Sequence, residues 1–92
     1  MFKLLRVEKL TAGTTATSVM VNGHAFLIAN NSADASVYFK EKAADNVACT
    51  SSNGFLVPAG KTTDEPMIAE ELSVVASAAS TDVRVLILDQ YG

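Results

Sequence analysis

Short runs of β-branched and aromatic residues recur at intervals of roughly 8–12 residues, separated by Gly, Asn, Ser, Asp and Pro, and this spacing restricts the fold more than any other feature. It is typical of antiparallel sandwiches and barrels. We predict a single all-β domain over residues 1–92, a small antiparallel β-sandwich or jelly-roll-like barrel of about 7–8 short strands. The runs cover residues 2–10, 15–21, 24–30, 35–41, 55–57 and 83–88, with a weaker one at 47–50.

Turn residues predict where the chain reverses. Asn22-Gly23 stands between the second and third runs and predicts a two-residue β-hairpin, because Asn and Gly tolerate the positive φ angles of such a turn. Residues 52–62 read Ser-Asn-Gly-Phe-Leu-Val-Pro-Ala-Gly-Lys-Thr, with strong turn signals on both sides of an apolar segment. The segment at 55–57 is therefore predicted to be a short strand whose apolar residues help to close the sandwich.

Two runs carry patterns that predict their place in a sheet. Residues 2–10 have charged and apolar side chains on both faces, which suits an edge strand or a strand that packs on another subunit. In the last run, Val83, Val85 and Ile87 line one face, and the length and apolar character of the run predict a central strand. The small residues 77–82 before it predict a tight connection between neighbouring strands.

Residues 63–79 fit two structures. Thr63 or Asp64 could cap a helix, and Pro66 would fall near its first turn. Apolar side chains recur there at helical spacing, at Ile68, Leu72, Val75 and Ala79. Against a helix, the stretch at 72–76 contains adjacent β-branched residues, which lose side-chain freedom in a helix and fit a pleated sheet better. We favour strands for this segment.

The composition limits the possible functions. Of the 92 residues, 49% are hydrophobic and 18% are charged, which is apolar for a small soluble monomer and predicts that part of the surface belongs to an interface. The net charge is −3 and the basic residues form no stripe, so the chain lacks the electrostatic footprint of a nucleic-acid-binding protein.

Three sequence features bear on the compartment. The uncharged stretch 10–33 contains many Thr, Ser and Asn residues, so we predict no membrane-spanning segment. Lys3 and Arg6 interrupt the apolar residues at the start, and we predict no secretion signal. Cys49 is the single cysteine, which can neither form an internal disulfide nor hold a structural zinc ion by itself, and we expect folding in a reducing cytoplasm.

Side chains that could carry chemistry are few. His24 follows a predicted turn and is interpreted as an exposed or hydrogen-bonded turn residue, and Cys49 as a small buried hydrophobe. A hydrolase would require the two to converge, or one of them to meet a carboxylate. The acidic pairs are interpreted as solvated charges, because adjacent strand residues point to opposite faces. These pairs are Asp64-Glu65 and Glu70-Glu71.

Loop oxygens give no stronger signal. Asn31, Asp34 and Asp45 could supply ligands to calcium, but the pattern of a calcium-binding loop is missing. Asn30-Asn31-Ser32 matches a glycosylation triplet and is interpreted as a turn. We therefore predict no catalytic, cofactor-binding or metal-binding residue, no cofactor and no enzyme activity.

Five segments in a fixed order resemble a known class of proteins. They are Phe-Leu-Ile-Ala-Asn-Asn-Ser at 26–32, Val-Tyr-Phe at 37–39, Asn-Gly-Phe-Leu-Val-Pro-Ala-Gly at 53–60, Glu-Leu-Ser-Val-Val-Ala at 71–76 and Val-Arg-Val-Leu-Ile at 83–87. In this order they resemble the small all-β virion structural proteins of tailed bacteriophages. Those proteins place a Pro-x-Gly turn after the Val-Tyr segment and end in a closing hairpin.

The resemblance implies a virion subunit that is made in the host cytoplasm and acts in many copies without catalysis. We expect a capsid decoration or cement protein that stabilises the shell by forming homo-oligomers, with a trimer favoured, and by packing on the major capsid protein or other virion proteins. A neck, collar or tail-associated accessory is an alternative location. A carbohydrate- or receptor-binding module that uses Tyr38 and loop carboxylates is an alternative function. We expect neither nucleic acid nor a membrane as a partner.

Overall fold

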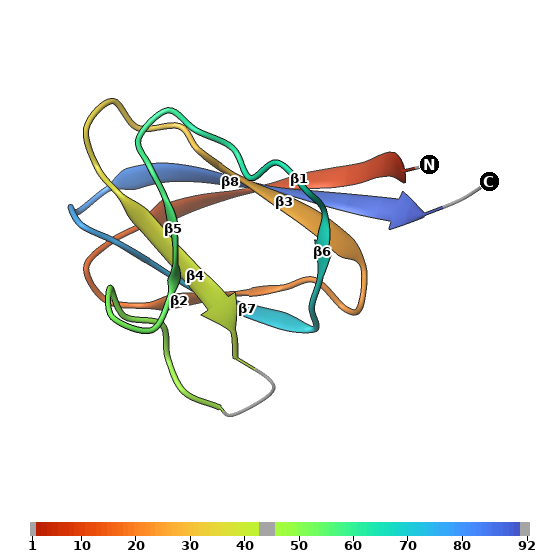
Figure 1. The fold of residues 1–92 in the computed structure, drawn as a ribbon, viewed down its shortest axis with the longest axis horizontal. Helices are drawn as coiled ribbons and strands as arrows, with labels where there is room; N and C mark the ends of the chain where they lie inside the picture. Colours follow the sequence, from red (N-terminus) through yellow and green to blue (C-terminus); the bar gives the residue numbers. More distant parts are fainter. Residues whose placement is uncertain (1, 43–45, 91–92) are drawn as a thin grey trace.

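The computed structural model describes residues 2–42 and 46–90. Within these residues every regular element is a β-strand, and eight are present, as predicted (Figure 1). The strands are β1 (Phe2–Ala12), β2 (Thr17–Met20), β3 (Ala25–Asn30), β4 (Val37–Glu41), β5 (Phe55–Val57), β6 (Met67–Ile68), β7 (Glu71–Ala76) and β8 (Thr81–Gln90).

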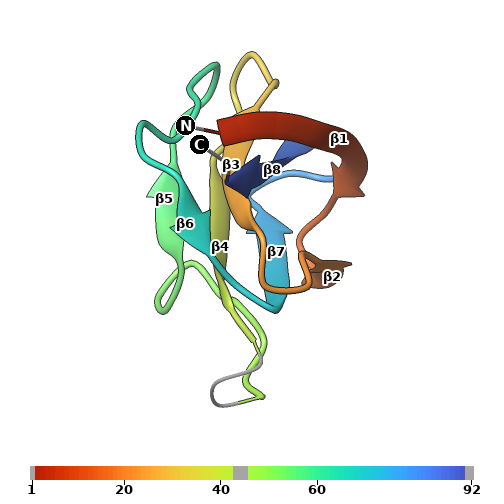
Figure 2. The same cartoon turned by 90° about the vertical axis from the view of Figure 1, so that its right-hand side faces the viewer.

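The strands form two four-stranded antiparallel sheets, in the orders β1-β8-β3-β6 and β2-β7-β4-β5. The pairing is nested, with β1 against β8, β2 against β7, β3 against β6 and β4 against β5. Two further pairs, β8 with β3 and β7 with β4, complete the sheets. Eight strands nested in this way and folded into two packed sheets make a jelly roll (Figures 1 and 2). The predicted all-β sandwich or jelly-roll architecture is confirmed.

The hydrophobic core lies between the two sheets and takes alternate residues from each strand. Val83, Val85 and Ile87 of β8 are fully buried, as their alternation predicted. The ring of Phe26 on β3 meets the ring of Phe39 on β4 edge to face, with the centroids 5.9 Å apart. Such a pair contributes about 0.5–1.5 kcal/mol beyond the burial of its area. The inner faces of both sheets therefore share one core.

The turn at Asn22-Gly23 has the predicted backbone but not the predicted partners. Both residues have positive φ, 59° and 80°. However, β2 and β3 lie in different sheets, so the predicted hairpin is wrong. The turn is a corner between the sheets, and it bonds to the matching corner between β6 and β7. Gly23 N donates to Ala69 O, and Asn22 N donates to Glu70 O.

The connection at residues 77–82 also crosses between the sheets. It joins β7 of one sheet to β8 of the other, so the predicted tight link between neighbouring strands, and with it a closing hairpin, is wrong. The physical reason is the nested pairing: most strands bond to a partner far away in sequence, and consecutive strands other than β4 and β5 lie in different sheets. Only β4 and β5 are consecutive strands that pair with each other among those described.

The ambiguous segment 63–79 forms strands β6 and β7, as favoured, and the helical alternative is wrong. Its start is held against β3, since Thr63 N donates to Ile28 O and Thr63 Oγ1 accepts from Ile28 N. The weak run at 47–50 is not a strand. It lies over β7, where Cys49 N donates to the buried Ser73 hydroxyl at 2.8 Å.

The predicted edge and central positions are confirmed. β1 is an edge strand that pairs with β8 alone, and β8 lies between β1 and β3. A bulge at Leu5 shifts the register of β1, so Leu4 and Arg6 oppose consecutive residues of β8. Residues 2–7 are all exposed to solvent, on both faces of the strand.

Candidate functional site

Of the side chains considered for chemistry, His24 and Cys49 lie in different surroundings. His24 is half-buried directly after the corner at 22–23, where its backbone N donates to Val21 O at 3.2 Å. Cys49 is buried under the turn that precedes β5, and its thiol lies against Thr50 O at 3.6 Å. Burial raises the pKa of the Cys49 thiol, and the nearby charge of Lys40 offsets this only in part. A raised pKa disfavours the thiolate that a nucleophile needs.

The acidic and amide candidates are dispersed over the surface. Asp64 and Glu65 are exposed between β5 and β6, and Glu70 is exposed at a corner while Glu71 begins β7. Asn31 donates to Asp82 Oδ2 at 3.0 Å.

Asp34 lies exposed in the loop before β4, and Asp45 falls outside the described residues. Among residues 2–42 and 46–90, no three His, Cys, Asp or Glu side chains gather in a way that could hold a metal ion.

Tyr38 lines a shallow hollow of about 460 Å³ on the outer side of the β2-β7-β4-β5 sheet. Four hydroxyl-bearing residues share it: Thr14, Thr50, Ser51 and Ser77. The described residues that line the hollow include no carboxylate, so none of the described loop carboxylates joins Tyr38 there.

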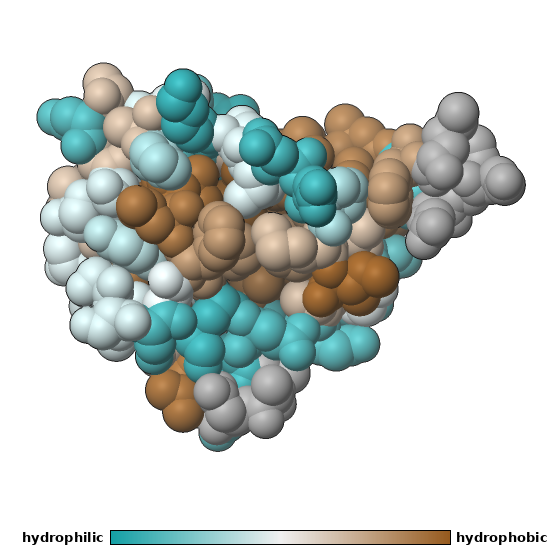
Figure 3. Space-filling model, viewed as in Figure 1, coloured by the Kyte–Doolittle hydropathy of each residue, from teal (hydrophilic) through white to brown (hydrophobic). Residues whose placement is uncertain are grey.

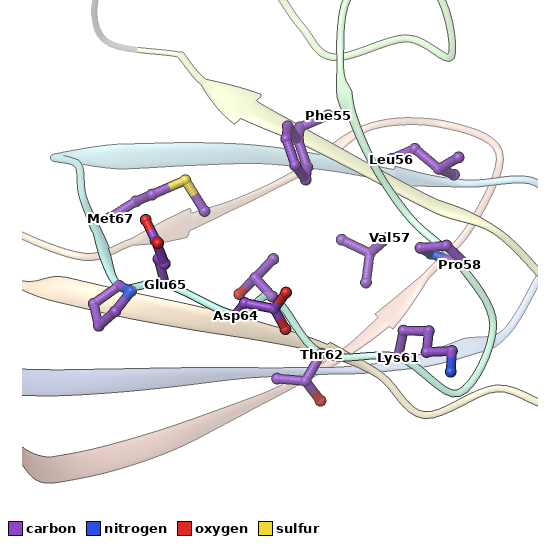
Figure 4. Close-up of a pocket in the computed structure, with 11 residues that line it drawn as sticks. Phe55, Leu56, Val57, Pro58, Lys61, Thr62, Asp64, Glu65 and Met67 are labelled. Atoms are coloured by element: carbon purple, nitrogen blue, oxygen red, sulfur yellow. The ribbon is translucent and has the colours of Figure 1, made fainter.

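A larger groove of about 650 Å³ lies where β5 and β6, the outermost strands of the two sheets, face each other. Figure 4 shows Val57 and Met67 reaching in from its two sides, with Asp64 and Glu65 on the segment between them. Phe55 stacks at a tilt on Phe39 with 5.5 Å between centroids, yet remains 61% exposed. The predicted strand at 55–57 is confirmed, although of its three residues only Val57 is buried.

Another apolar feature is the outer face of the β1-β8-β3-β6 sheet. Strand pairing sets Leu4, Leu88, Ala25 and Ile68 in one row that crosses all four strands, and Val7, Leu86 and Leu27 in the next row. We call these seven residues the apolar face. The ends of the first row are open to solvent, Leu4 at 52% and Ile68 at 69% exposure, whereas Leu88 and Ala25 between them are buried.

The next two rows of the same sheet are polar. Lys9 opposes Arg84, and Thr11 opposes Asp82. The Arg84 guanidinium donates two hydrogen bonds, of 3.0 and 3.2 Å, to the Asp82 carboxylate. The Arg84 bonds and the Asn31 amide hold the pKa of the Asp82 carboxyl below its ordinary value. The outer face is therefore divided into an apolar half and a charged half.

The outer face of the opposite sheet is mixed in character. Its rows place Ser18 beside Ser73 and Met20 beside Glu71, and Tyr38 lies between Leu56 and Val75. Figure 3 shows brown apolar surface over β5 and near β6, with teal polar surface beside it. Only the β1-β8-β3-β6 sheet carries two adjacent, wholly apolar rows among the described strands. Leu4, Val7 and Ile68 are the exposed members of the apolar face, and exposed apolar side chains gathered on one face favour a surface that another molecule covers.

No protein-family model matches the chain, and searches of curated proteins and of solved structures find no match either. In the part of the chain that the structure describes, no helix is long and apolar enough to cross a membrane.

The apolar face could not be predicted from the sequence alone. Leu86 and Leu88 alternate with core residues, so their orientation was visible, but Ala25 and Ile68 join them only through pairings between strands far apart in the chain. The low proportion of charged residues predicted an interface, and the notable candidates were the first strand and the uncharged segment after it, so the prediction did not include β6 and β8.

Proposed function

We propose that this chain is a non-enzymatic structural subunit of a tailed-bacteriophage virion, a decoration or cement protein that docks on the major capsid protein. The single observation that supports this role is the apolar face, two rows of uncharged side chains across a sheet that has no second layer on that side. Such a face suits an apolar protein surface and offers no group that would recognise a small polar substrate.

The fold is compatible with this role but does not decide it. Jelly rolls occur in viral capsid subunits and also in lectins and other proteins, so the architecture supports an assembly role and a sugar-binding role alike. The resemblance of the segments at 26–32, 37–39 and 53–60 to virion proteins favours the assembly role, although the closing hairpin of those proteins is replaced here by a crossing between the sheets.

Quantitative mass spectrometry of gradient-purified particles tests the proposal. We expect the chain in copy numbers that are stoichiometric with the major capsid protein. Its absence from intact particles would refute a virion role.

A sedimentation assay tests the docking face. Purified protein is added to shells that lack it, and the bound fraction is measured after pelleting. Ile68→Glu places a charge on the exposed end of the apolar face, and we expect at least a tenfold loss of binding, since a buried unpaired charge is costly. Ser18→Glu, an exposed position on the opposite sheet, is the matched control and should bind as the wild type does. Equal binding by both variants would place the contact elsewhere.

A sugar-binding role is the second candidate, and the hollow beside Tyr38 favours it. The Tyr38 ring offers an apolar surface to a sugar, and the hydroxyl groups that line the same hollow offer hydrogen-bonding partners. Glycan-array binding that is lost in Tyr38→Ala and kept in Tyr38→Phe would support this role. An array without any bound glycan would remove it.

A further inference from the structure

The outward edge of β1 is an open sheet edge that carries exposed apolar side chains. No other described strand pairs with that edge. Of the nine large hydrophobic side chains that are exposed among the described residues, four lie on this one strand: Phe2, Leu4, Leu5 and Val7. An exposed apolar edge strand is a template for strand pairing unless something covers it.

We propose that this edge is covered by β1 of a second copy of the chain, which runs antiparallel to it across a two-fold axis at Val7. The inference rests on the proposed function, in which the subunit acts in several copies. It deepens that function by naming a second copy as the partner of β1. The contact is isologous, with the same residues on both copies.

The geometry of antiparallel strands limits the possible registers. Residues directly opposite each other carry their side chains on the same face. A two-fold axis perpendicular to the sheet must therefore set one residue opposite its own copy. Because Leu5 lies in the bulge, Leu4 and Arg6 count as consecutive positions in such a pairing.

Charge excludes most of the remaining registers. An axis at Arg6, Glu8 or Lys9 sets two like charges directly opposite each other, which is destabilising. An axis at Leu4 sets Lys3 opposite Arg6 of the second copy, with the same effect.

Registers centred further along the strand, at residues 10 or 11, leave the exposed segment 2–7 without a partner. They fail to cover the apolar end of β1 that makes the edge a docking site.

The register centred on Val7 pairs opposite charges. It sets Arg6 opposite Glu8 of the second copy, and Glu8 opposite Arg6 of that copy. Within one chain these two side chains already form an ion pair of 2.8 Å, so the two-fold pair would carry a cluster of four alternating charges. Repulsion between like charges disfavours the other registers, and attraction between opposite charges favours this one. The charges therefore make the pairing specific.

The same register also joins one row of the two apolar faces. Within each copy, Val7 lies in a row with Leu86 and Leu27. When Val7 opposes its own copy, the two rows become one apolar row that runs across both molecules. The paired sheets then present one continuous outer surface to whatever the assembly docks on.

The mass of the purified protein in solution is the first test. We expect light scattering after size exclusion to give a dimer, twice the 9.7 kDa chain mass, that dissociates on dilution. Val7→Lys sets two like charges at the axis, and we expect a monomer with an unchanged circular dichroism spectrum, since this side chain is 47% exposed. A wild-type monomer at all concentrations, or a trimer, would overturn the proposed pairing.

Cysteine cross-linking tests the register. Under oxidation, Val7→Cys should give a disulfide-linked dimer on a non-reducing gel, because only a residue at the axis meets its own copy. Thr11→Cys, exposed on the same face, is the matched control and should stay monomeric on the gel. The wild type controls for the buried Cys49. Cross-linking of Thr11→Cys but not Val7→Cys would overturn the register.

The results separate this inference from the virion role. Monomeric protein that is still found in purified particles would remove the β1 contact and leave the proposed function standing. A dimer that is missing from particles would do the reverse.

Discussion

The Asn30 side-chain amide donates a hydrogen bond of 2.9 Å to the carbonyl oxygen of Val57, and this bond joins the end of β3 in one sheet to the end of β5 in the other. The same amide donates to Ala35 O at 2.8 Å, and its oxygen accepts from Ser32 N at 3.1 Å. Asn30 is only 1% exposed. A buried amide with all these partners holds together the loop end of the sandwich.

Replacing Asn30 should therefore destabilise the protein strongly. Asn30→Ala leaves the Val57 carbonyl without this donor and Ser32 N without its acceptor, whereas Ala35 O still accepts from the Ser32 hydroxyl. Each buried group that loses its partner costs about 1–3 kcal/mol. We expect the free energy of unfolding to fall by about 2–4 kcal/mol in urea denaturation. Ser18→Ala, at an exposed strand position, should change it by less than about 0.5 kcal/mol. Equal effects of the two substitutions would mean that the bridge between the sheets is dispensable.

The backbone φ of Gly54 is not in the left-handed region, so the backbone conformation does not require glycine at this position. Glycine is required there because a side chain would have no room. A Cβ there would collide with the Cys49 sulfur and lie 2.9 Å from Tyr38 Cβ. We expect Gly54→Ala to cost about 1–3 kcal/mol by overpacking. Gly13→Ala, where no atom lies within 4 Å of the new Cβ, is the control and should be nearly neutral. In a double-mutant cycle, Cys49→Ala should relieve part of the Gly54→Ala cost. Full additivity would contradict the proposed collision.

Asp82 should contribute to stability in a pH-dependent way. The bonds from Arg84 and Asn31 lower its pKa in the folded state, so its contribution is present above the ordinary carboxyl value of 3.8 and is lost as the pH falls below it. We expect Asp82→Asn to flatten the loss of stability in that acidic range, measured by denaturation at pH 2 to 6 (about two units either side of the ordinary value). If the stability of the wild type and of Asp82→Asn changes in parallel over this pH range, the folded carboxyl titrates normally.

Cys49 should react slowly with thiol reagents in the folded protein. Burial both restricts access and raises the thiol pKa, so little thiolate is present at neutral pH. We expect labelling by a disulfide reagent to require unfolding and to quicken in parallel with it when urea is added. Rapid labelling of the native protein would mean that the turn over Cys49 opens readily.

The alternation of apolar and polar side chains along the strands correctly predicted which residues of the last strand point inward. Val83, Val85 and Ile87 were assigned to one face from spacing alone, and all three are core residues. The reason is local: successive strand residues must point to opposite faces, whatever the strand pairs with. The mixed character of residues 2–10 predicted an edge for the same reason.

Pairing was not predictable in this way. Asn22-Gly23 has the φ angles of a hairpin turn, and it was the strongest hairpin signal in the chain, yet it serves a corner between sheets. A turn motif fixes the backbone of two residues and leaves open whether the next strand lies beside the previous one or across the core. The role of Asn30 was hidden for a similar reason, because its partners Ala35 and Val57 reach it only through the folded topology.

The pairing of β1 with β8 has a consequence for how the protein is made. On the ribosome β1 emerges long before β8, and β3 also needs β8 beside it. Neither strand can complete its sheet until β8 has been synthesised, so the β1-β8-β3-β6 sheet cannot form while only the earlier strands are available. Sheets built from such distant pairs form slowly, in milliseconds to seconds. During that interval the apolar edge of β1 is open to chaperones and to other nascent copies alike.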